Sequence, residues 1–264
     1  LFYDRKKKMG KAYRNVRAVD STQNAILLGN YGEYDEKTER TLMTKKAVFI
    51  QFQKEDSLYL HADTLISIRD SLKTKTDTTV YSLIRGFHRV KIFKSDFQAK
   101  CDSLVYSTLD STIELHTKPV LWSDKNQITA DFIKVFTKND EIREIKMFAN
   151  SLIVSQSDTI HFDQIKGNDM IAFVENQKLV KIDVTENGAA IYFGKEEGEL
   201  MGVNKITCRN MIIYMDSSEV DKIWFYDKPE GTLYPPDYLK DEELTFDNFQ
   251  WLERFRPLNK NEIF

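Results

Sequence analysis

The residues that could carry acid–base or metal chemistry are few in this chain. Its histidines are His61, His88, His116 and His161, and none of them has the i,i+4 or CxxC-type spacing of a metal site. The sequence also contains no GxSxG motif, no phosphate-binding P-loop and no GxGxxG motif. We therefore expect no enzyme activity, no metal and no cofactor.

One polar position recurs along the chain, and its acidic members raise the question of a calcium site. A small residue precedes the position and apolar residues follow it. We call these positions the anchors: Asn30, Asp63, Asp102, Asp131, Asn168 and Arg209. A calcium loop gathers several oxygen ligands within about 12 residues, whereas successive anchors are 33, 39, 29, 37 and 41 residues apart. We therefore interpret the anchors as turn-forming residues at strand entries.

The segments around each anchor predict β-strands. Met170, Ile171 and Phe173 follow one anchor closely, and apolar runs such as 47–52 and 87–93 precede others. Short polar turns separate these runs, which is typical of an all-β chain. A long period with loops of variable length indicates a repeat architecture. The predicted fold class is therefore an all-β repeat protein.

Composition limits the other classes of function. The chain has 264 residues, enough for one long domain or two small ones, and its net charge of −3 provides no basic field for nucleic acid. No apolar run approaches the ~18 residues needed to span a bilayer. Because the chain begins at Leu1, the lack of an export signal says nothing about its compartment. Cys101 and Cys208 fill the small position before an anchor, which favours packed side chains over a disulfide.

The last part of the chain differs from the repeats. Four prolines from Pro229 onwards disfavour strand pairing. The apolar residues among them are expected to fold back and cap an end of the sheet. They are Phe246, Phe249, Trp251, Leu252 and Phe255. We predict a repeat domain over residues 1–236 and a short, irregular C-terminal capping tail over residues 237–264.

The repeats resemble those of a known family. The copies that carry the resemblance are Leu60-His-Ala-Asp-Thr-Leu65, Ala99-Lys-Cys-Asp-Ser-Leu-Val-Tyr106, Ile128-Thr-Ala-Asp-Phe-Ile133 and Ile165-Lys-Gly-Asn-Asp-Met-Ile-Ala-Phe173. A small residue, an Asp or Asn, an apolar residue and an aromatic residue recur in this way in the OstA/LptA lipopolysaccharide-transport family. The resemblance covers residues 10–234, with Arg209 and the first copy departing from it. The tail, with Trp251 and Arg256-Pro257, is similar to that of the OstA-like proteins of Bacteroidetes.

The resemblance implies both a fold and a function. The implied fold is an elongated, slightly twisted β-jellyroll that is V-shaped in section and open along one side. The implied protein is periplasmic, with membrane association left open, and belongs to outer-membrane biogenesis. It would shield the acyl chains of lipopolysaccharide (lipid A) between the inner and outer membranes, and would pair edge to edge with related β-jellyroll domains.

Strand alternation predicts which side chains face inward. Residues two and four positions after an anchor share one face, and the resemblance makes this face the lipid-binding one. The expected groove-lining residues are Leu65, Leu104, Tyr106, Ile133, Val135, Met170, Met211 and Ile213. The alternative left open is a structural or interaction β-solenoid with a closed core and no lipid ligand. A carbohydrate-active β-helix enzyme would need clustered carboxylates, which the sequence does not place together.

Overall fold

A computed structural model describes residues 1–21, 23–52, 56–74, 76–139, 141–197, 199–216, 219–236, 238–240 and 243–264. β-strands make up most of these residues, and the part of the chain so described has no α-helix. The strands pair antiparallel in a large sheet that is not closed. The predicted all-β class is therefore confirmed.

The chain divides into two compact units. Unit 1 comprises Leu1–Pro119, Lys134–Asp140 and Arg256–Phe264, and unit 2 comprises Val120–Ile133 and Glu141–Phe255. Strand β11 (Phe132–Lys138) contributes residues to both units. The predicted boundary between residues 236 and 237 stays a prediction.

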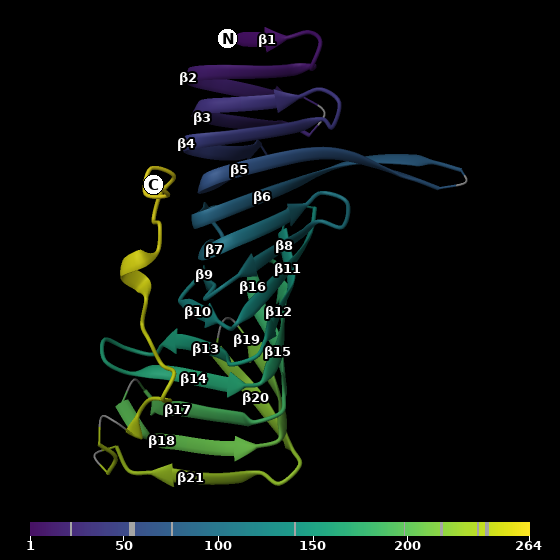
Figure 1. The fold of residues 1–264 in the computed structure, drawn as a ribbon. Helices are drawn as coiled ribbons and strands as arrows, with labels where there is room; N and C mark the ends of the chain where they lie inside the picture. The colour runs from purple at the N-terminus through teal and green to yellow at the C-terminus, as the bar shows by residue number, and fades with distance from the viewer. Residues whose placement is uncertain are drawn as a thin grey trace. The chain divides into compact units, whose positions relative to one another are not determined.

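Unit 1 is built from strands that pair with their neighbours in the sequence (Figure 1). These strands are β1 (Phe2–Asp4), β2 (Met9–Asp20), β3 (Ala25–Asp35), β4 (Arg40–Phe52), β5 (Ser57–Lys73), β6 (Thr78–Phe93), β7 (Gln98–Ser107) and β8 (Thr112–His116). Strands β5 and β6 are the longest, and their pairing runs out to the Lys73–Thr78 pair. The result is an antiparallel meander with one projecting hairpin.

The long strands of unit 1 bend where the pairing register shifts. In β2 the shift lies between Tyr13 and Val16, and the two residues between them, Arg14 and Asn15, have φ values of 63° and 48°. Two consecutive left-handed residues turn the strand sharply, at some cost in backbone strain. We call these bends corners, and anchors such as Asp63 lie at them.

In unit 2 each repeat is divided at the corner into two separate strands, which form two walls (Figure 1). The first wall pairs β9 (Val120–Ser123), β10 (Asn126–Thr129), β13 (Ser151–Gln156), β14 (Phe162–Gly167), β17 (Gly188–Glu196), β18 (Glu199–Cys208) and β21 (Glu230–Tyr234) in that order. The second wall pairs β12 (Glu141–Phe148), β15 (Asp169–Glu175), β16 (Lys178–Thr185), β19 (Asn210–Asp216) and β20 (Glu219–Tyr226).

The anchors of unit 2 connect the corners of successive repeats. The backbone N–H of Asn168 donates to the carbonyl of Glu186 at 2.8 Å, and Glu186 has a positive φ. The same bond joins Asp131 to Ala149 and Arg209 to Asp227, at 3.0 Å in both cases. The backbone of the anchor residue, and not its side chain, makes the bond that connects the corners. The anchor position can therefore hold an acid, an amide or an arginine.

The residue before an anchor is small because the corner leaves no room for a larger one. A Cβ atom added to Gly167 would lie 2.4 Å from Cγ1 of Val184, well inside van der Waals contact. Cys101 and Cys208 occupy the equivalent position, and both are buried free thiols. Burial raises the pKa of Cys101 to about 12. The interpretation of both cysteines as packed small side chains is confirmed.

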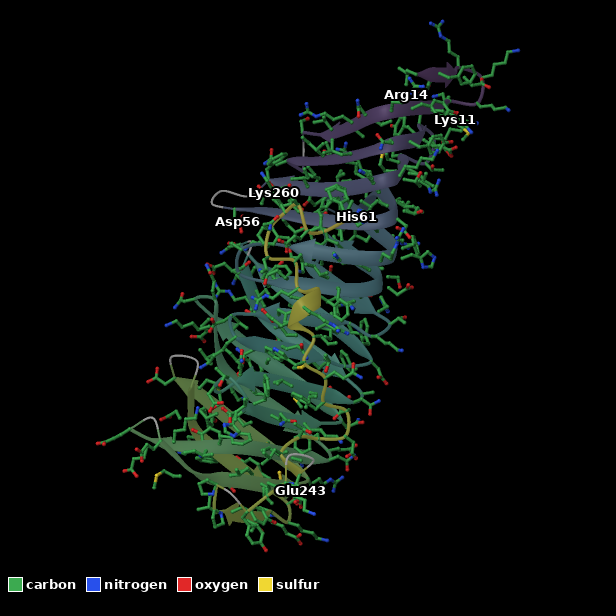
Figure 2. All side chains as sticks on the ribbon, turned by 90° about the vertical axis from the view of Figure 1, so that its left-hand side faces the viewer. Lys11, Arg14, Asp56, His61, Glu243 and Lys260 are labelled. Atoms are coloured by element: carbon green, nitrogen blue, oxygen red, sulfur yellow. The ribbon has the colours of Figure 1, made fainter. Side chains whose placement is uncertain are left out.

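The C-terminal tail folds back as expected, but it contacts the face of a wall rather than an end. In unit 2 the rings of Trp251 and Phe162 of β14 are 5.0 Å apart. In unit 1 the ring of Phe264 lies 5.0 Å from that of His61, and Lys260 lies over Tyr59 on the same side (Figure 2). The tail therefore shields apolar strand faces from water. It also includes the 3-10 turn η2 (Glu253–Phe255).

Candidate functional site

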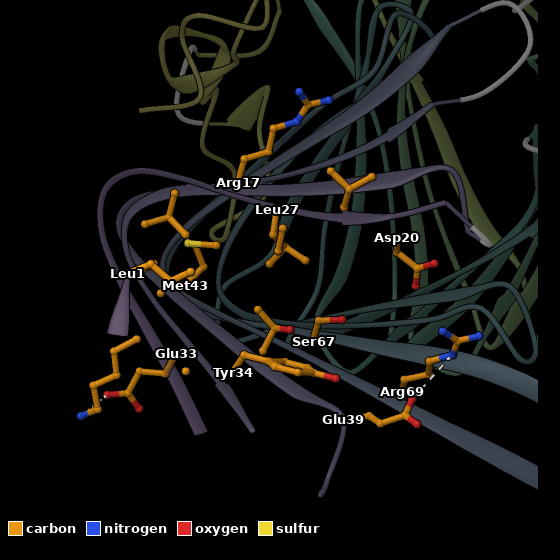
Figure 3. Close-up of a pocket in the computed structure, with 18 of the residues that line it drawn as sticks. Leu1, Arg17, Asp20, Leu27, Glu33, Tyr34, Glu39, Met43, Ser67 and Arg69 are labelled. Atoms are coloured by element: carbon orange, nitrogen blue, oxygen red, sulfur yellow. Dashed lines mark ion pairs between the residues drawn. The ribbon is translucent and has the colours of Figure 1, made fainter. Parts of the chain in front are cut away.

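A cavity of about 590 Å³ lies within unit 1, between strands β2, β3, β4 and β5 (Figure 3). Its apolar lining includes Val16, Ala18, Leu27 and Met43. The side chain of Met43 is completely buried, so it lies beneath the surface of the hollow. The half-buried Val16 and Ala18 give the cavity exposed apolar surface.

The corner of β2 explains why one strand can line two sides of this cavity. Gly10 and Ala12 precede the corner at residues 14–15, whereas Val16 and Ala18 follow it, and all four line the hollow. Alternate residues of a strand share a face. A corner of two residues keeps that alternation in step. Lys11, Arg17 and Val19 line the cavity as well, so β2 borders it on both sides of the corner.

Ionisable groups surround the opening, and several of them are paired. Lys11 forms an ion pair with Glu33 at 3.0 Å, and Glu33 also accepts a short hydrogen bond from the Tyr31 hydroxyl. The Tyr31 bond, and then the Lys11 bond, hold the pKa of Glu33 below its usual value. Arg69 lies 3.8 Å from Glu39 at another point of the rim (Figure 3). An apolar floor under a charged rim suits an amphiphilic ligand.

The histidines do not meet in one place, and each has its own local partner. The partners are the Ala47 carbonyl for His61 (2.8 Å), Asp102 for His88 (3.3 Å), Glu114 for His116 (3.5 Å) and Asp158 for His161 (2.8 Å). Burial lowers the pKa of His61. Within the described ranges, no group of three His, Cys, Asp or Glu residues could hold a metal ion.

The structure places the eight predicted groove residues in closely packed positions. Seven of them are buried, namely Leu65, Leu104, Ile133, Val135, Met170, Met211 and Ile213. Tyr106 is half-buried, with its ring 6.2 Å from that of Phe49. These burial values agree with the expected inward orientation. None of the eight residues lines the 590 Å³ cavity, however.

A smaller cavity of about 210 Å³ lies between the two walls of unit 2. The first wall contributes Ile153 and Ile165, and the second contributes Leu179 and Ile182. The walls of unit 2 therefore face each other across an apolar space. The ammonium group of Lys195 lies at its edge, where it pairs with Asp158 at 2.9 Å.

Two sets of residues escaped the sequence-based prediction. The cavity-lining residues Val16 and Ala18 lie before the first anchor, where the repeat pattern is weakest. The second set consists of buried glutamines four positions before an anchor. They are Gln98, Gln127 and Gln164, and the sequence signal that could have revealed them is a Gln-x-x-small-(Asp/Asn) pattern that occurs three times.

Comparisons with known proteins add no identification to this geometry. Searches against family models and against curated proteins found no match for the chain. In the part of the chain that the structure describes, no helix is both long and apolar enough to cross a membrane. Any functional assignment therefore depends on the cavity and on the repeat.

Proposed function

We propose that this chain is a periplasmic lipopolysaccharide-transport module that shields acyl chains in an apolar groove between the inner and outer membranes. The observation that carries the proposal is the 590 Å³ cavity of unit 1, with its apolar lining and charged rim. The resemblance of the repeat to the OstA/LptA family supplies the identity of the lipid. The proposed activity is binding and passage, with no bond made or broken.

The chemistry of the lining fits a hydrocarbon chain. A saturated acyl chain has no hydrogen-bonding groups, so its affinity comes from removing CH₂ groups from water, at about 0.8 kcal/mol each. Val16, Ala18, Leu27 and Met43 provide such an environment. The paired charges at the rim would remain in water beside the polar part of the lipid.

Edge-to-edge strand pairing with related β-jellyroll domains belongs to the same proposal. The strands of this chain form a sheet that is not closed, and the edge of an open sheet is a place for β-augmentation by another domain.

The alternative function is a structural or interaction β-solenoid with a closed core. The observation that favours it is the near-complete burial of residues such as Ile133 and Met170, which leaves little room for a ligand beside them. The two proposals differ in what an acyl chain would contact. A carrier places lipid against β2 and against the predicted groove residues, whereas a closed solenoid excludes lipid from all of them.

Photo-crosslinking in cells tests the choice between them. A photoreactive residue at Ala18, inside the cavity, should capture lipopolysaccharide, as should one at Ile133 or Met170 if the chain passes them. Arg14, which is exposed at the corner of the same strand, is the matched control (Figure 2). The Ala18→Asp variant should block transport, because an unpaired carboxylate in an apolar site costs several kcal/mol. Circular dichroism checks that each variant folds.

One outcome would reject the carrier proposal. If folded, correctly located protein captures no lipopolysaccharide at Ala18, Ile133 or Met170, the closed solenoid takes its place. Mass spectrometry of the unmodified protein tests the same proposal independently, because a lipid carrier should copurify with lipid.

A further inference from the structure

The tail of unit 2 is held on the first wall by side chains that bind its backbone. Gln164 of β14 is completely buried. Its side-chain amide donates to the carbonyl of Leu244 at 2.9 Å, and its side-chain oxygen accepts from the N–H of Phe246 at 3.0 Å. One glutamine therefore binds the acceptor of one tail residue and the donor of the residue two positions later.

Gln127 of β10 repeats this arrangement. It too is completely buried, and it donates to the carbonyl of Gln250 at 2.6 Å while accepting from the N–H of Leu252 at 2.7 Å. Each glutamine therefore binds two backbone groups that lie two residues apart in the tail. The tail is not a regular strand here, because it bends at Leu244 and Thr245 and the N–H of Phe249 donates to the carbonyl of Phe246 at 2.9 Å. We call Gln127 and Gln164 the backbone clamps.

The clamps occupy one position of the repeat, four residues before an anchor. Lys205 occupies that position in the next repeat, and its ammonium group donates to the carbonyl of Glu243 at 2.7 Å. In unit 1 the equivalent Gln98 accepts from the side chain of Arg256 at 2.6 Å. This position of the repeat thus contacts the tail in four copies, but only Gln127 and Gln164 bind the tail backbone through both a donor and an acceptor.

Apolar contacts complete the site in unit 2. Phe162, two residues before Gln164 on β14, packs against the rings of Phe249 and Trp251 at 5.3 and 5.0 Å. Leu244 and Phe246 pack against the cluster of Ile191, Phe193 and Val203. The site therefore combines apolar side chains with two glutamine amides, each of which makes two hydrogen bonds to the bound backbone. Its ligand class is a peptide with aliphatic and aromatic side chains that offers a carbonyl and an N–H two residues apart.

The tail is a separable ligand of this site. It leaves the sheet after β21 through Pro235 and Pro236, which cannot donate backbone hydrogen bonds and so end strand pairing. A second copy of the chain carries the same segment and can make every contact of the first. Exchange of an identical element between two copies needs no new interface.

We propose that this face of unit 2 is a peptide-binding site, and that it exchanges its own tail for the tail of a second copy. The occupant is the segment 243–252, and the exchange does not depend on the lipid proposal. Because the tethered tail acts at a high effective concentration, exchange requires that the two copies open together, as they do during joint refolding.

Crosslinking of two distinguishable copies tests the exchange. In full-length chains whose native cysteines are replaced by alanine, one copy carries Lys166→Cys and the other Phe246→Cys, since Lys166 lies over the Phe246 ring at 5.6 Å. Alanine fits because it fills the same small position at Ala62 and Ala130. The copies are refolded together and treated with a short bismaleimide. The expected product is a heterodimer that contains both tags.

Two controls make the result decisive. A single chain with both substitutions should give an intramolecular crosslink, which shows that the site forms. A copy with Tyr13→Cys, an exposed residue of unit 1, replaces the tail cysteine and should give at least tenfold less heterodimer. If the intramolecular crosslink forms but the mixed sample gives no more heterodimer than this control, the exchange is refuted.

A peptide experiment tests the role of the clamps. The probe is a synthetic peptide of residues 243–255, and the receptor is a full-length chain whose own tail is disabled by Phe246→Asp and Trp251→Asp. N-methylation at residue 246 or 252 removes a bound N–H and should weaken binding about tenfold. N-methylation at residue 245 or 251 is the matched control and should change binding much less. Equal losses at all four positions, or no binding of the parent peptide, would overturn the proposal.

Discussion

Replacing Gln127 with leucine should release the middle of the tail. Leucine is apolar and similar in length, so it fills the space of the glutamine with little change in packing. It removes both bonds of the clamp, the 2.6 Å bond to Gln250 and the 2.7 Å bond to Leu252. The carbonyl of the exposed Gln250 and the N–H of the half-buried Leu252 would then lose these partners.

The expected size follows from the two lost bonds. A hydrogen bond between neutral groups contributes about 0.5–1.5 kcal/mol net, so their loss should lower the free energy of local opening by about 1–3 kcal/mol. Since 1.4 kcal/mol corresponds to a factor of ten, the tail should open about 5 to 150 times more often. The rest of unit 2 should be less affected, because opening of a short segment is a local event.

Hydrogen–deuterium exchange followed by mass spectrometry measures this opening directly. The segment 243–255 should exchange faster in Gln127→Leu, while a segment such as β16 keeps its protection. Gln156→Leu is the control, because Gln156 is an exposed glutamine at the end of the neighbouring strand β13. If the tail exchanges at the same rate in Gln127→Leu as in the parent protein, then the clamp contributes nothing and the reasoning from its geometry is wrong.

Three further predictions concern stability, each measured by urea unfolding. Gly167→Ala should lose about 1–3 kcal/mol, because its Cβ would lie 2.4 Å from Val184, whereas Gly194→Ala meets nothing closer than 3.7 Å and should lose much less. Burial lowers the pKa of His61, so the unfolding free energy should fall as the pH drops below about 6.5, and His61→Gln should flatten that dependence. Burial raises the pKa of Asp163, so Asp163→Asn should stabilise the protein at neutral pH, with the gain vanishing below pH of about 3.8; an unchanged profile would contradict either assignment.

The strands of this protein could be predicted from its sequence because they depend on the types and spacing of neighbouring residues. Alternation after an anchor predicted that Leu65 and Met211 each lie on the inward face of their own strand, and both side chains are buried. The small position before the anchor also pointed to tight packing, which Gly167 now explains. These features require only the period of a strand and the size of a side chain.

The cavity and the clamps could not be predicted in the same way. A cavity forms only where two packed strands are far enough apart. The identities of Ala18 and Met43 do not determine that separation. Gln127 looks like an ordinary polar residue on a strand, and its role depends on a segment more than 100 residues later in the chain. The repetition of the glutamine was visible, but its partner was not.

The corners also explain why the number of residues between successive anchors varies. Anchors mark fixed points of the fold, so the residues between two anchors measure how far the hairpins extend before the chain returns. The step of 39 residues from Asp63 to Asp102 includes the extension of β5 and β6 to Lys73 and Thr78. Insertions at such hairpin tips deepen a wall without disturbing its alternation, whereas a single residue added at a corner would turn one wall inside out. The spacing between successive anchors therefore reports how far the wall extends in that repeat.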